Sequence, residues 1–208
     1  MRRKSLLGIA AAATIAAALA CAGGASAQSP GGTAAGGADP TYYNVPFGYR
    51  DLHAGMNGAD VQTLNWVLRG LGLGTGYDGA FQSVTDGAVR NLQAGAGLSA
   101  NGVVRLETRK ALASRMLNQT ASWYGPAFYG NRTACGKKLT KRTVGVAHRR
   151  LPCGTRVAFA YGGRWVRAKV IDRGPYIKGR KWDLTRALAL QLGTVPLGTA
   201  VVKAAVAP

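Results

Sequence analysis

Val170-Ile171-Asp172-Arg173-Gly174-Pro175-Tyr176 is the stretch of this 208-residue chain that says most about its fold and chemistry. An apolar run typical of a strand ends there at a carboxylate, and the Gly-Pro pair that follows indicates a tight turn. From residue 118 to the C-terminus the chain holds 17 Lys or Arg but only two acids, Asp172 and Asp183. Acid–base chemistry in this half of the chain therefore has at most two carboxyl groups available.

The segments on either side of this stretch predict a compact barrel over residues 119–208. Short β-branched or aromatic runs, parted by Gly and Pro, predict strands at residues 120–124, 143–148, 156–161, 164–171 and 199–206. One helix is expected among them. Asp183 is its predicted N-cap, Leu184, Leu188 and Leu192 are its buried stripe, and Gly193 ends it.

Residues 48–117 have helical periodicity instead and predict a small three-helix unit. The apolar positions that fall at three- and four-residue steps are Val61, Leu64, Leu68 and Leu71 in the first helix, Val84, Ala88 and Leu92 in the second, and Leu106 and Leu112 in the third. Asp78-Gly79 and Asn101-Gly102 supply the turns between them. The expected architecture is therefore a two-domain α + β chain.

The N-terminus predicts export from a bacterium. Arg2, Arg3 and Lys4 precede an apolar run over residues 6–20, and Ala25-Ser26-Ala27 has the form of a signal peptidase site, so residues 1–27 are interpreted as a signal peptide. The alternative is a lipoprotein modified at Cys21, which would add a membrane anchor. Residues 28–47 are rich in Gly, Ala and Pro and are expected to be a flexible linker.

Cysteine usage agrees with export. Without Cys21, the pair Cys135 and Cys153 remains, and a pair in an exported chain predicts a disulfide that would stabilise the domain by roughly 3 kcal/mol. The alternative is a metal site with His148, but it would offer only three ligands and has no Cys-x-x-Cys spacing. We therefore expect neither a metal nor a cofactor.

The helical unit resembles the peptidoglycan-binding domain found beside many cell-wall hydrolases. The resemblance covers about 65 residues and rests on the order and spacing of several short pieces, among them Leu52-x-x-Gly55-x-x-Gly58-Ala59-Asp60-Val61 and Tyr77-Asp78-Gly79-Ala80-Phe81. The later pieces are Ala88-Val89-x-x-Leu92-Gln93 and Gly97-Leu98-x-x-Asn101-Gly102-Val103-Val104. A plain helical spacer is the alternative interpretation.

The C-terminal region resembles the rare lipoprotein A (RlpA) family, whose fold is a six-stranded double-psi β-barrel shared with expansins. Five ordered blocks carry the resemblance: Ala121-Ser122-Trp123-Tyr124-Gly125, Thr133-Ala134-Cys135-Gly136, the run from Val146 to Val157, the stretch at 170–176, and Trp182-Asp183-Leu184. Active members of the family are lytic transglycosylases that cut peptidoglycan glycan strands. They carry a Glu at the position held here by Lys137, a departure that also leaves room for a non-catalytic, expansin-like role.

A lytic transglycosylase can work with a single acid, because a sugar hydroxyl attacks in place of water and one group first donates a proton and then takes one. Hydrolases usually need two carboxyl groups. With two acids in the domain, and Asp183 predicted as a cap, Asp172 is the candidate acid/base. The alternative for Asp172 is a turn residue that bonds to the backbone of Gly174 and Tyr176.

The remaining candidate site residues carry alternatives as well. His148 is expected to hydrogen-bond the Asp172 side chain or the substrate, as the resemblance implies, or to be a packed structural histidine. Candidate substrate-binding residues are Trp123, Tyr124, Lys137, Arg173, Tyr176 and Asp183. The aromatic ones could instead be core, Lys137 a solvated loop charge, and Asp183 only a helix cap.

The strong positive charge of residues 119–208 predicts an anionic partner. For an exported chain this means peptidoglycan glycan strands with their peptide carboxylates and anionic wall polymers, attracted in a salt-dependent way. Nucleic acid is not expected, since the sequence holds no nucleic-acid motif. Two other functions stay open: a module that grips or loosens the wall without cutting it, and a barrel that docks on a partner protein.

Overall fold

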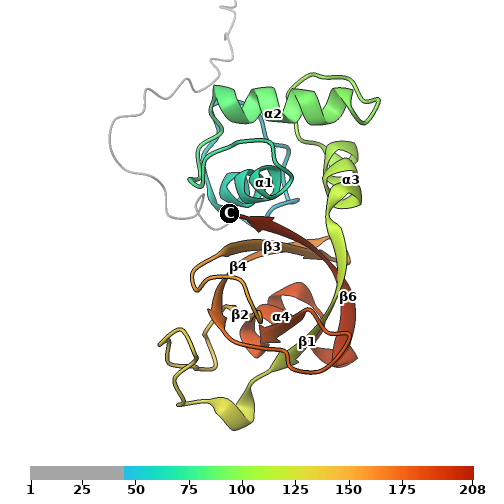
Figure 1. Ribbon diagram of the computed structural model, residues 1–208. Coiled ribbons are helices and arrows are strands. Elements are labelled where there is room, and N and C mark those ends of the chain that lie inside the picture. Colours follow the sequence, from blue (N-terminus) through green and yellow to red (C-terminus); the bar gives the residue numbers. More distant parts are fainter. Residues whose placement is uncertain (1–44) are drawn as a thin grey trace, which may run out of the picture. The chain divides into compact units, whose positions relative to one another are not determined.

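The computed structural model describes residues 45–208, drawn in colour in Figure 1. The predicted signal peptide, the lipidation site at Cys21 and the linker up to residue 44 lie outside the described residues. Phe47, at the last position of the expected linker, is 3% exposed and packs edge-on against the ring of Trp165, with 5.1 Å between the ring centroids. No helix within residues 45–208 has the length and apolar character needed to cross a membrane.

Three helices follow in the order expected: α1 (Ala59–Gly70), α2 (Ser83–Ala94) and α3 (Leu106–Arg115). Val61, Leu64 and Leu68 form the buried face of α1, as predicted. In α2 the predicted positions Ala88 and Leu92 are buried, whereas Val84 is 47% exposed. Leu106, the first residue of α3, is also exposed.

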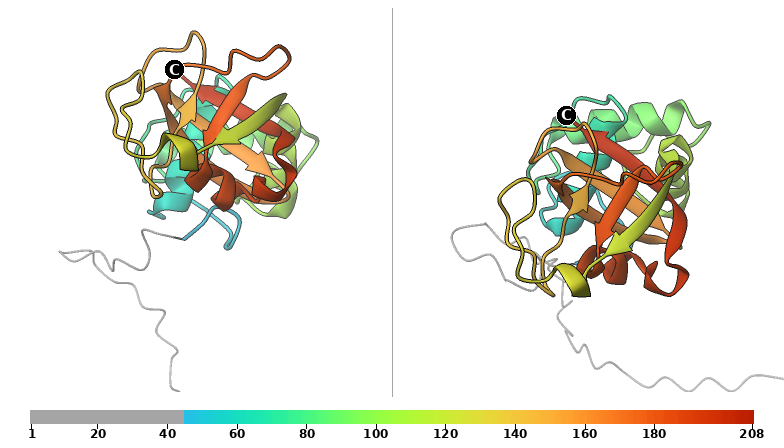
Figure 2. Two further views of the ribbon diagram at one scale, coloured as in Figure 1. Left: turned by 90° about the horizontal axis from the view of Figure 1, so that it is seen from below. Right: turned by 60° about the horizontal axis from the view of Figure 1, so that its bottom comes forward.

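The C-terminal region is a closed six-stranded barrel with the order β1-β5-β2-β4-β3-β6. The strands are β1 (Leu117–Tyr124), β2 (Val146–Ala147), β3 (Arg156–Tyr161), β4 (Arg164–Asp172), β5 (Trp182–Thr185) and β6 (Thr199–Ala207). The β1–β5 and β2–β4 pairs are parallel and the others are antiparallel. The predicted α + β class, three helices followed by a six-stranded barrel, is confirmed (Figure 2).

The expected helix at Asp183 begins later than predicted, and a strand precedes it. Residues 182–185 form β5, and α4 (Arg186–Leu192) starts after Thr185, whose hydroxyl accepts a hydrogen bond from Leu188 N at 3.4 Å. Asp183 is therefore not the helix cap, and Leu184 is a strand residue that faces the barrel core. Gly193 does end the helix, in the left-handed conformation that favours glycine.

Alternating residues divide β3 and β6 between two cores. Val157 and Phe159 point into the barrel, whereas Ala158 and Ala160 belong to the apolar cluster of the helical unit. Ala205 and Ala207 of β6 also belong to the apolar cluster of the helical unit, and α1 lies against this wall of small side chains. A wall of methyl groups lets the helix approach closely, so the two domains share one continuous packed layer.

Gly70, the last residue of α1, is the closest point of that contact. A Cβ atom built there would lie 2.9 Å from Ala205 Cβ and 3.0 Å from its carbonyl carbon, and backbone cannot yield as a flexible side chain can. We expect Gly70→Ala to destabilise the protein by about 1–3 kcal/mol through overpacking. Urea denaturation followed by circular dichroism measures this. Gly87→Ala is the matched control, since nothing lies within 4 Å of a Cβ at Gly87 in α2, and it should stabilise or leave stability unchanged.

Candidate functional site

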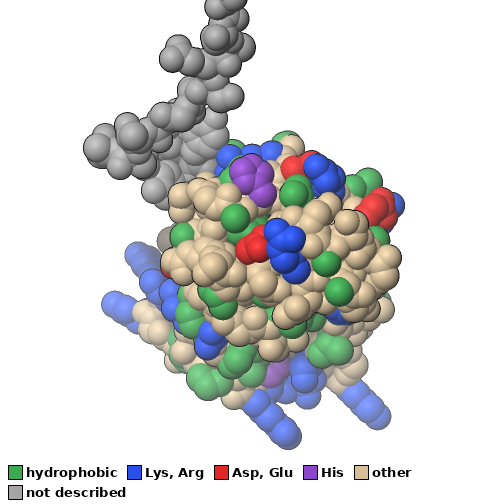
Figure 3. All heavy atoms as spheres, turned by 90° about the horizontal axis from the view of Figure 1, so that it is seen from above, with side chains coloured by type: hydrophobic (Ala, Val, Ile, Leu, Met, Phe, Trp, Pro, Cys, Tyr) green, Lys and Arg blue, Asp and Glu red, His purple; other side chains and the backbone are tan. Residues whose placement is uncertain are grey.

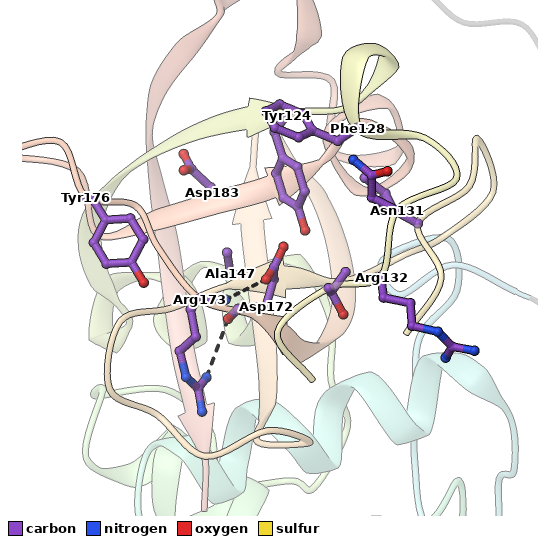
Figure 4. A pocket seen from close by; sticks show the side chains of 11 residues that line it. Tyr124, Phe128, Asn131, Arg132, Ala147, Asp172, Arg173, Tyr176 and Asp183 are labelled. Atoms are coloured by element: carbon purple, nitrogen blue, oxygen red, sulfur yellow. Dashed lines mark hydrogen bonds between the residues drawn. The ribbon is translucent and has the colours of Figure 1, made fainter. Parts of the chain in front are cut away.

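A pocket of about 350 Å³ opens at the barrel end where β1, β4 and β5 meet the loop that follows β1. Figure 4 shows its side chains, drawn from several parts of the chain. The lining residues are Tyr124, Phe128, Asn131, Arg132, Thr133, Leu139, Ala147, Asp172, Arg173, Tyr176 and Asp183. Both carboxyl groups of the barrel therefore line one pocket.

The strand register explains why the two acids meet. Ala147 of β2 is the Cα partner of Asp172 on β4 and also of Asp183 on β5. Adjacent strands lie about 4.8 Å apart, so the two acids flank a small residue with their α-carbons roughly 10 Å apart. The methyl side chain of Ala147 leaves the space between the two acids open and forms part of the pocket floor.

Asp172 uses one carboxylate oxygen to hold its surroundings in place. Its Oδ1 accepts hydrogen bonds from Ala134 N and Arg173 N, both at 2.8 Å. The carboxylate also interacts with the side-chain hydroxyl group of Tyr124. The expected turn bonds to Gly174 and Tyr176 are replaced by bonds to Arg173 and to a loop distant in sequence. Asp172 thus holds a distant loop in place through Oδ1 while its side chain lines the pocket.

Asp183 is oriented by a hydroxyl group, since Ser122 of β1 donates a hydrogen bond to its Oδ1. Ser122 is the Cα partner of Asp183 in the parallel β1–β5 pair. Within the part of the chain that the structure describes, neither acid forms an ion pair. All five ion pairs within residues 45–208 lie in the helical unit, where acidic and basic side chains are mixed on the surface (Figure 3). The pocket therefore holds two carboxyl groups not committed to cations.

Tyr124 places a hydroxyl group beside the carboxylate of Asp172 (Figure 4). Its Oη is buried and interacts with that carboxylate. Burial, followed by the charge of Asp172, a side-chain hydrogen bond with Asp172 and the charge of Asp183, raises the pKa of Tyr124 far above its usual value. The hydroxyl therefore keeps its proton at any physiological pH and can serve only as a neutral donor or acceptor.

His148 does not form the predicted side-chain bond to Asp172. Its Nδ1 accepts hydrogen bonds from Leu151 N at 2.9 Å and Arg150 N at 3.2 Å, so the proton of the neutral ring is on Nε2. The ring is 6% exposed, packs on Trp182 at 4.6 Å, and is not among the residues that line the pocket. Its backbone N–H donates to the carbonyl oxygen of Asp172 at 3.2 Å, so it supports the acid through the backbone.

This environment predicts a pH dependence of stability. Burial first, and then the nearby cations, lower the pKa of His148 below its ordinary value of 6.5. Below pH 6.5 the histidine is protonated in the unfolded state but stays neutral in the folded state. The free energy of unfolding is therefore highest above pH 6.5 and falls as the pH drops toward the pKa of the folded state. We expect a loss between pH 7 and 5 that shrinks in His148→Gln. Denaturant titrations at several pH values measure this, and an unchanged slope would contradict it.

The other predicted site residues divide between pocket and core. Tyr176 is 80% exposed and lines the pocket with Arg173, whose guanidinium donates to Leu151 O at 3.1 Å. Trp123 instead packs against the barrel core and donates from Nε1 to Val195 O at 3.1 Å. Lys137 is exposed and lines a different groove. Of the three aromatic candidates, only Trp123 takes the core alternative.

The loop over residues 125–139 contributes pocket residues that sequence reasoning missed, chiefly Phe128, Asn131 and Arg132. Its position depends on long-range ties. The expected disulfide joins Cys135 to Cys153, and Cys135 N donates to Ile171 O at 3.2 Å. The predicted disulfide is the sequence signal that could have identified these residues, because it fixes the loop near Cys153. The hydrogen bond from Cys135 N then places the loop beside the end of β4.

Comparison with known proteins agrees with this architecture. Residues 117–204 match the family model described as "Lytic transglycolase", and residues 57–112 match "Putative peptidoglycan binding domain". "Probable endolytic peptidoglycan transglycosylase RlpA" of Aquifex aeolicus is 47% identical over 77 residues, which cover 36% of this chain and 34% of that protein. "Endolytic peptidoglycan transglycosylase RlpA" of Neisseria meningitidis is 36% identical over 125 residues, covering 50% and 52%.

Among solved structures, the expansin of Clavibacter michiganensis aligns with a TM-score of 0.36 at 20% identity, covering 43% of this chain and 48% of that one. The chain spans about a third to a half of the length of the two curated relatives. The barrel region is thus similar to the lytic-transglycolase family and to curated proteins named RlpA. The helical unit before it is similar to the peptidoglycan-binding domain family.

Proposed function

We propose that this protein binds peptidoglycan at the cell envelope and cleaves its glycan strands as a lytic transglycosylase. The observation that carries the proposal is the pocket at the barrel end, where the carboxyl groups of Asp172 and Asp183 and the hydroxyl group of Tyr124 meet and both backbone donors to Asp172 use the same oxygen, Oδ1. The relatives named as endolytic peptidoglycan transglycosylases match the chain over this same barrel region. The helical unit supplies adhesion to the same polymer.

In this proposal Asp172 acts as the single acid/base. Protonated Asp172 gives its proton to the glycosidic oxygen as the bond to the anomeric carbon breaks. The sugar's own 6-hydroxyl then attacks that carbon, and the carboxylate takes the hydroxyl proton, which restores the acid and leaves a 1,6-anhydro end. No water is consumed, so no second carboxylate is needed to activate one.

The neighbouring groups have defined tasks in this scheme. Tyr124 keeps its proton and can donate a hydrogen bond to the carboxylate form of Asp172. Asp183, fixed by Ser122, is placed to accept hydrogen bonds from sugar hydroxyl groups. Tyr176 and Phe128, which line the pocket with 80% and 53% exposure, offer flat apolar faces for pyranose rings.

Digestion of purified sacculi, analysed by mass spectrometry, tests the proposal. Strands with and without peptide stems should yield products with 1,6-anhydromuramyl ends. Products with reducing ends instead would indicate hydrolysis, for which the paired carboxyl groups of Asp172 and Asp183 would be the natural explanation. Binding without any new ends, at every pH and substrate tried, would leave the non-catalytic function favoured by Lys137 at the family's Glu position.

The proposal also includes the route by which the protein is exported and the way in which it is attached to the cell envelope. We expect residues 1–27 to direct secretion, with Cys21 as the alternative anchor, and the basic barrel to hold anionic wall polymers. Mass spectrometry of the N-terminus of the protein from cells distinguishes the two routes. A chain that starts at Gln28 supports signal cleavage, and an acylated Cys21 supports a lipoprotein.

A further inference from the structure

A second concavity, larger than the pocket, lies between the helical unit and the outer face of β4. Its volume is about 1080 Å³. One wall is made by the segment 45–49 with Ala59, Thr63 and Trp66 of the α1 region, and the other by residues 162–169 of the barrel. Lys137, Val144, Ile171, Leu190 and Gln191 complete the lining. We call it the seam groove.

The charge of the seam groove has one sign. Lys137, Arg164, Arg167 and Lys169 line it, and no Asp or Glu is among its lining residues. Three of these cations, Lys137, Arg164 and Lys169, are exposed, so their charge is open to a ligand. Arg167 differs, because its guanidinium donates to Gln62 and lies over the ring of Trp66 at 5.3 Å from the centroid. The groove therefore attracts anions, and Arg167 is held in place by Gln62 and Trp66.

The strand geometry sets these charges in a line. Trp165, Arg167 and Lys169 alternate with inward-facing Val166 and Ala168 on β4, so they share its outer face at steps of about 6.6–7 Å. Tyr49, 81% exposed, offers a flat apolar ring on the opposite wall. Spaced cations beside aromatic rings suit a sugar chain that carries anionic groups at repeated positions along its length.

We infer that the seam groove is a second polymer-binding site, which takes a glycan strand through the carboxylates of its peptide stems. The inference rests on the proposed function for the identity of the polymer. The loop over residues 131–139 connects the two sites, because Arg132 and Thr133 line the pocket while Lys137 lines the groove, and Thr133 N donates to Lys137 O at 2.7 Å. A strand held in the groove would thus be kept beside the pocket.

The test is a binding assay on sacculi freed of phosphate polymers with hydrofluoric acid, using the full chain in the Asp172→Asn background so that no strand is cut. We expect Lys169→Glu to weaken binding about fivefold and Lys137→Glu with Lys169→Glu more than tenfold, in a salt-sensitive manner. The effect should shrink on strands stripped of their stems by an amidase, because only the lactyl carboxylate of each muramic acid then remains. Lys141→Glu with Lys178→Glu is the control, since these exposed lysines line neither site.

Two other outcomes would overturn the inference. Equal losses in the groove and control variants would show general attraction by the basic surface. A loss seen only on sacculi that keep their phosphate polymers would assign the groove to a phosphate chain. Because the readout is binding, its failure is distinguishable from failure of the proposed function, which is read from anhydro ends made with Asp172 intact.

Discussion

Asp172→Asn is expected to abolish the formation of 1,6-anhydro ends, with a rate at least about a hundredfold below that of the unchanged protein. The physical reason is that an amide cannot give a proton to the glycosidic oxygen or take one from the attacking hydroxyl. The fold should survive, because the amide oxygen can still accept the hydrogen bonds that Ala134 N and Arg173 N now give to Oδ1. The measurement is single-turnover digestion of sacculi with quantification of anhydro ends.

Asp183→Asn is the matched comparison for this result. It removes the other carboxylate of the same pocket while keeping an oxygen for the Ser122 hydroxyl. We expect weaker substrate binding with a smaller loss of the chemical step. If Asp183→Asn eliminated the ends and Asp172→Asn kept them, the acid/base would be Asp183. Asp86→Asn, on the surface of α2 with an ion pair to Arg90, controls for the loss of a carboxylate elsewhere.

The fold could be predicted from sequence because its signals are local. Val61, Leu64 and Leu68 repeat at helical spacing, and the strand predicted at 156–161 coincides with β3. Asp183 was assigned wrongly for an equally local reason. A cap needs only an acceptor before an apolar helical stripe, and Thr185 two residues later satisfies the same rule. Only the pairing of Asp183 with Ala147 and Ser122 shows that it belongs to a strand.

The pocket shows the same limit on sequence reasoning. Asp172, Arg173 and Tyr176 could be predicted because they share one motif, and Tyr124 because it ends another. His148 was expected to contact the acid directly, but its hydrogen-bonding capacity at Nδ1 is filled by the backbone of residues 150 and 151. Phe128, Asn131 and Arg132 carry no motif of their own, and a disulfide and a bond to Asp172 bring their loop to the pocket.

Trp182→Ala is expected to cause the largest loss of stability, about 3–5 kcal/mol, because it empties the centre of the barrel. The side chain is fully buried and lies edge-on to Phe159, with 5.3 Å between the ring centroids. It also contacts the tilted ring of His148 and donates a hydrogen bond from its indole N–H to Gln119. Truncation therefore leaves a cavity and removes the donor from the half-buried Gln119 side chain.

Two comparisons make this prediction specific to packing. Trp182→Phe keeps a ring between Phe159 and His148, so it should cost clearly less than the truncation. Tyr176→Ala removes an aromatic ring that is 80% exposed and should change stability by less than about 0.5 kcal/mol. Urea denaturation followed by far-ultraviolet circular dichroism measures all three.

Because Trp182 precedes Asp183 on β5 and supports the His148 ring, a cavity there should also loosen the pocket floor. If Trp182→Ala cost no more than Tyr176→Ala, the barrel core would have to be organised around other side chains.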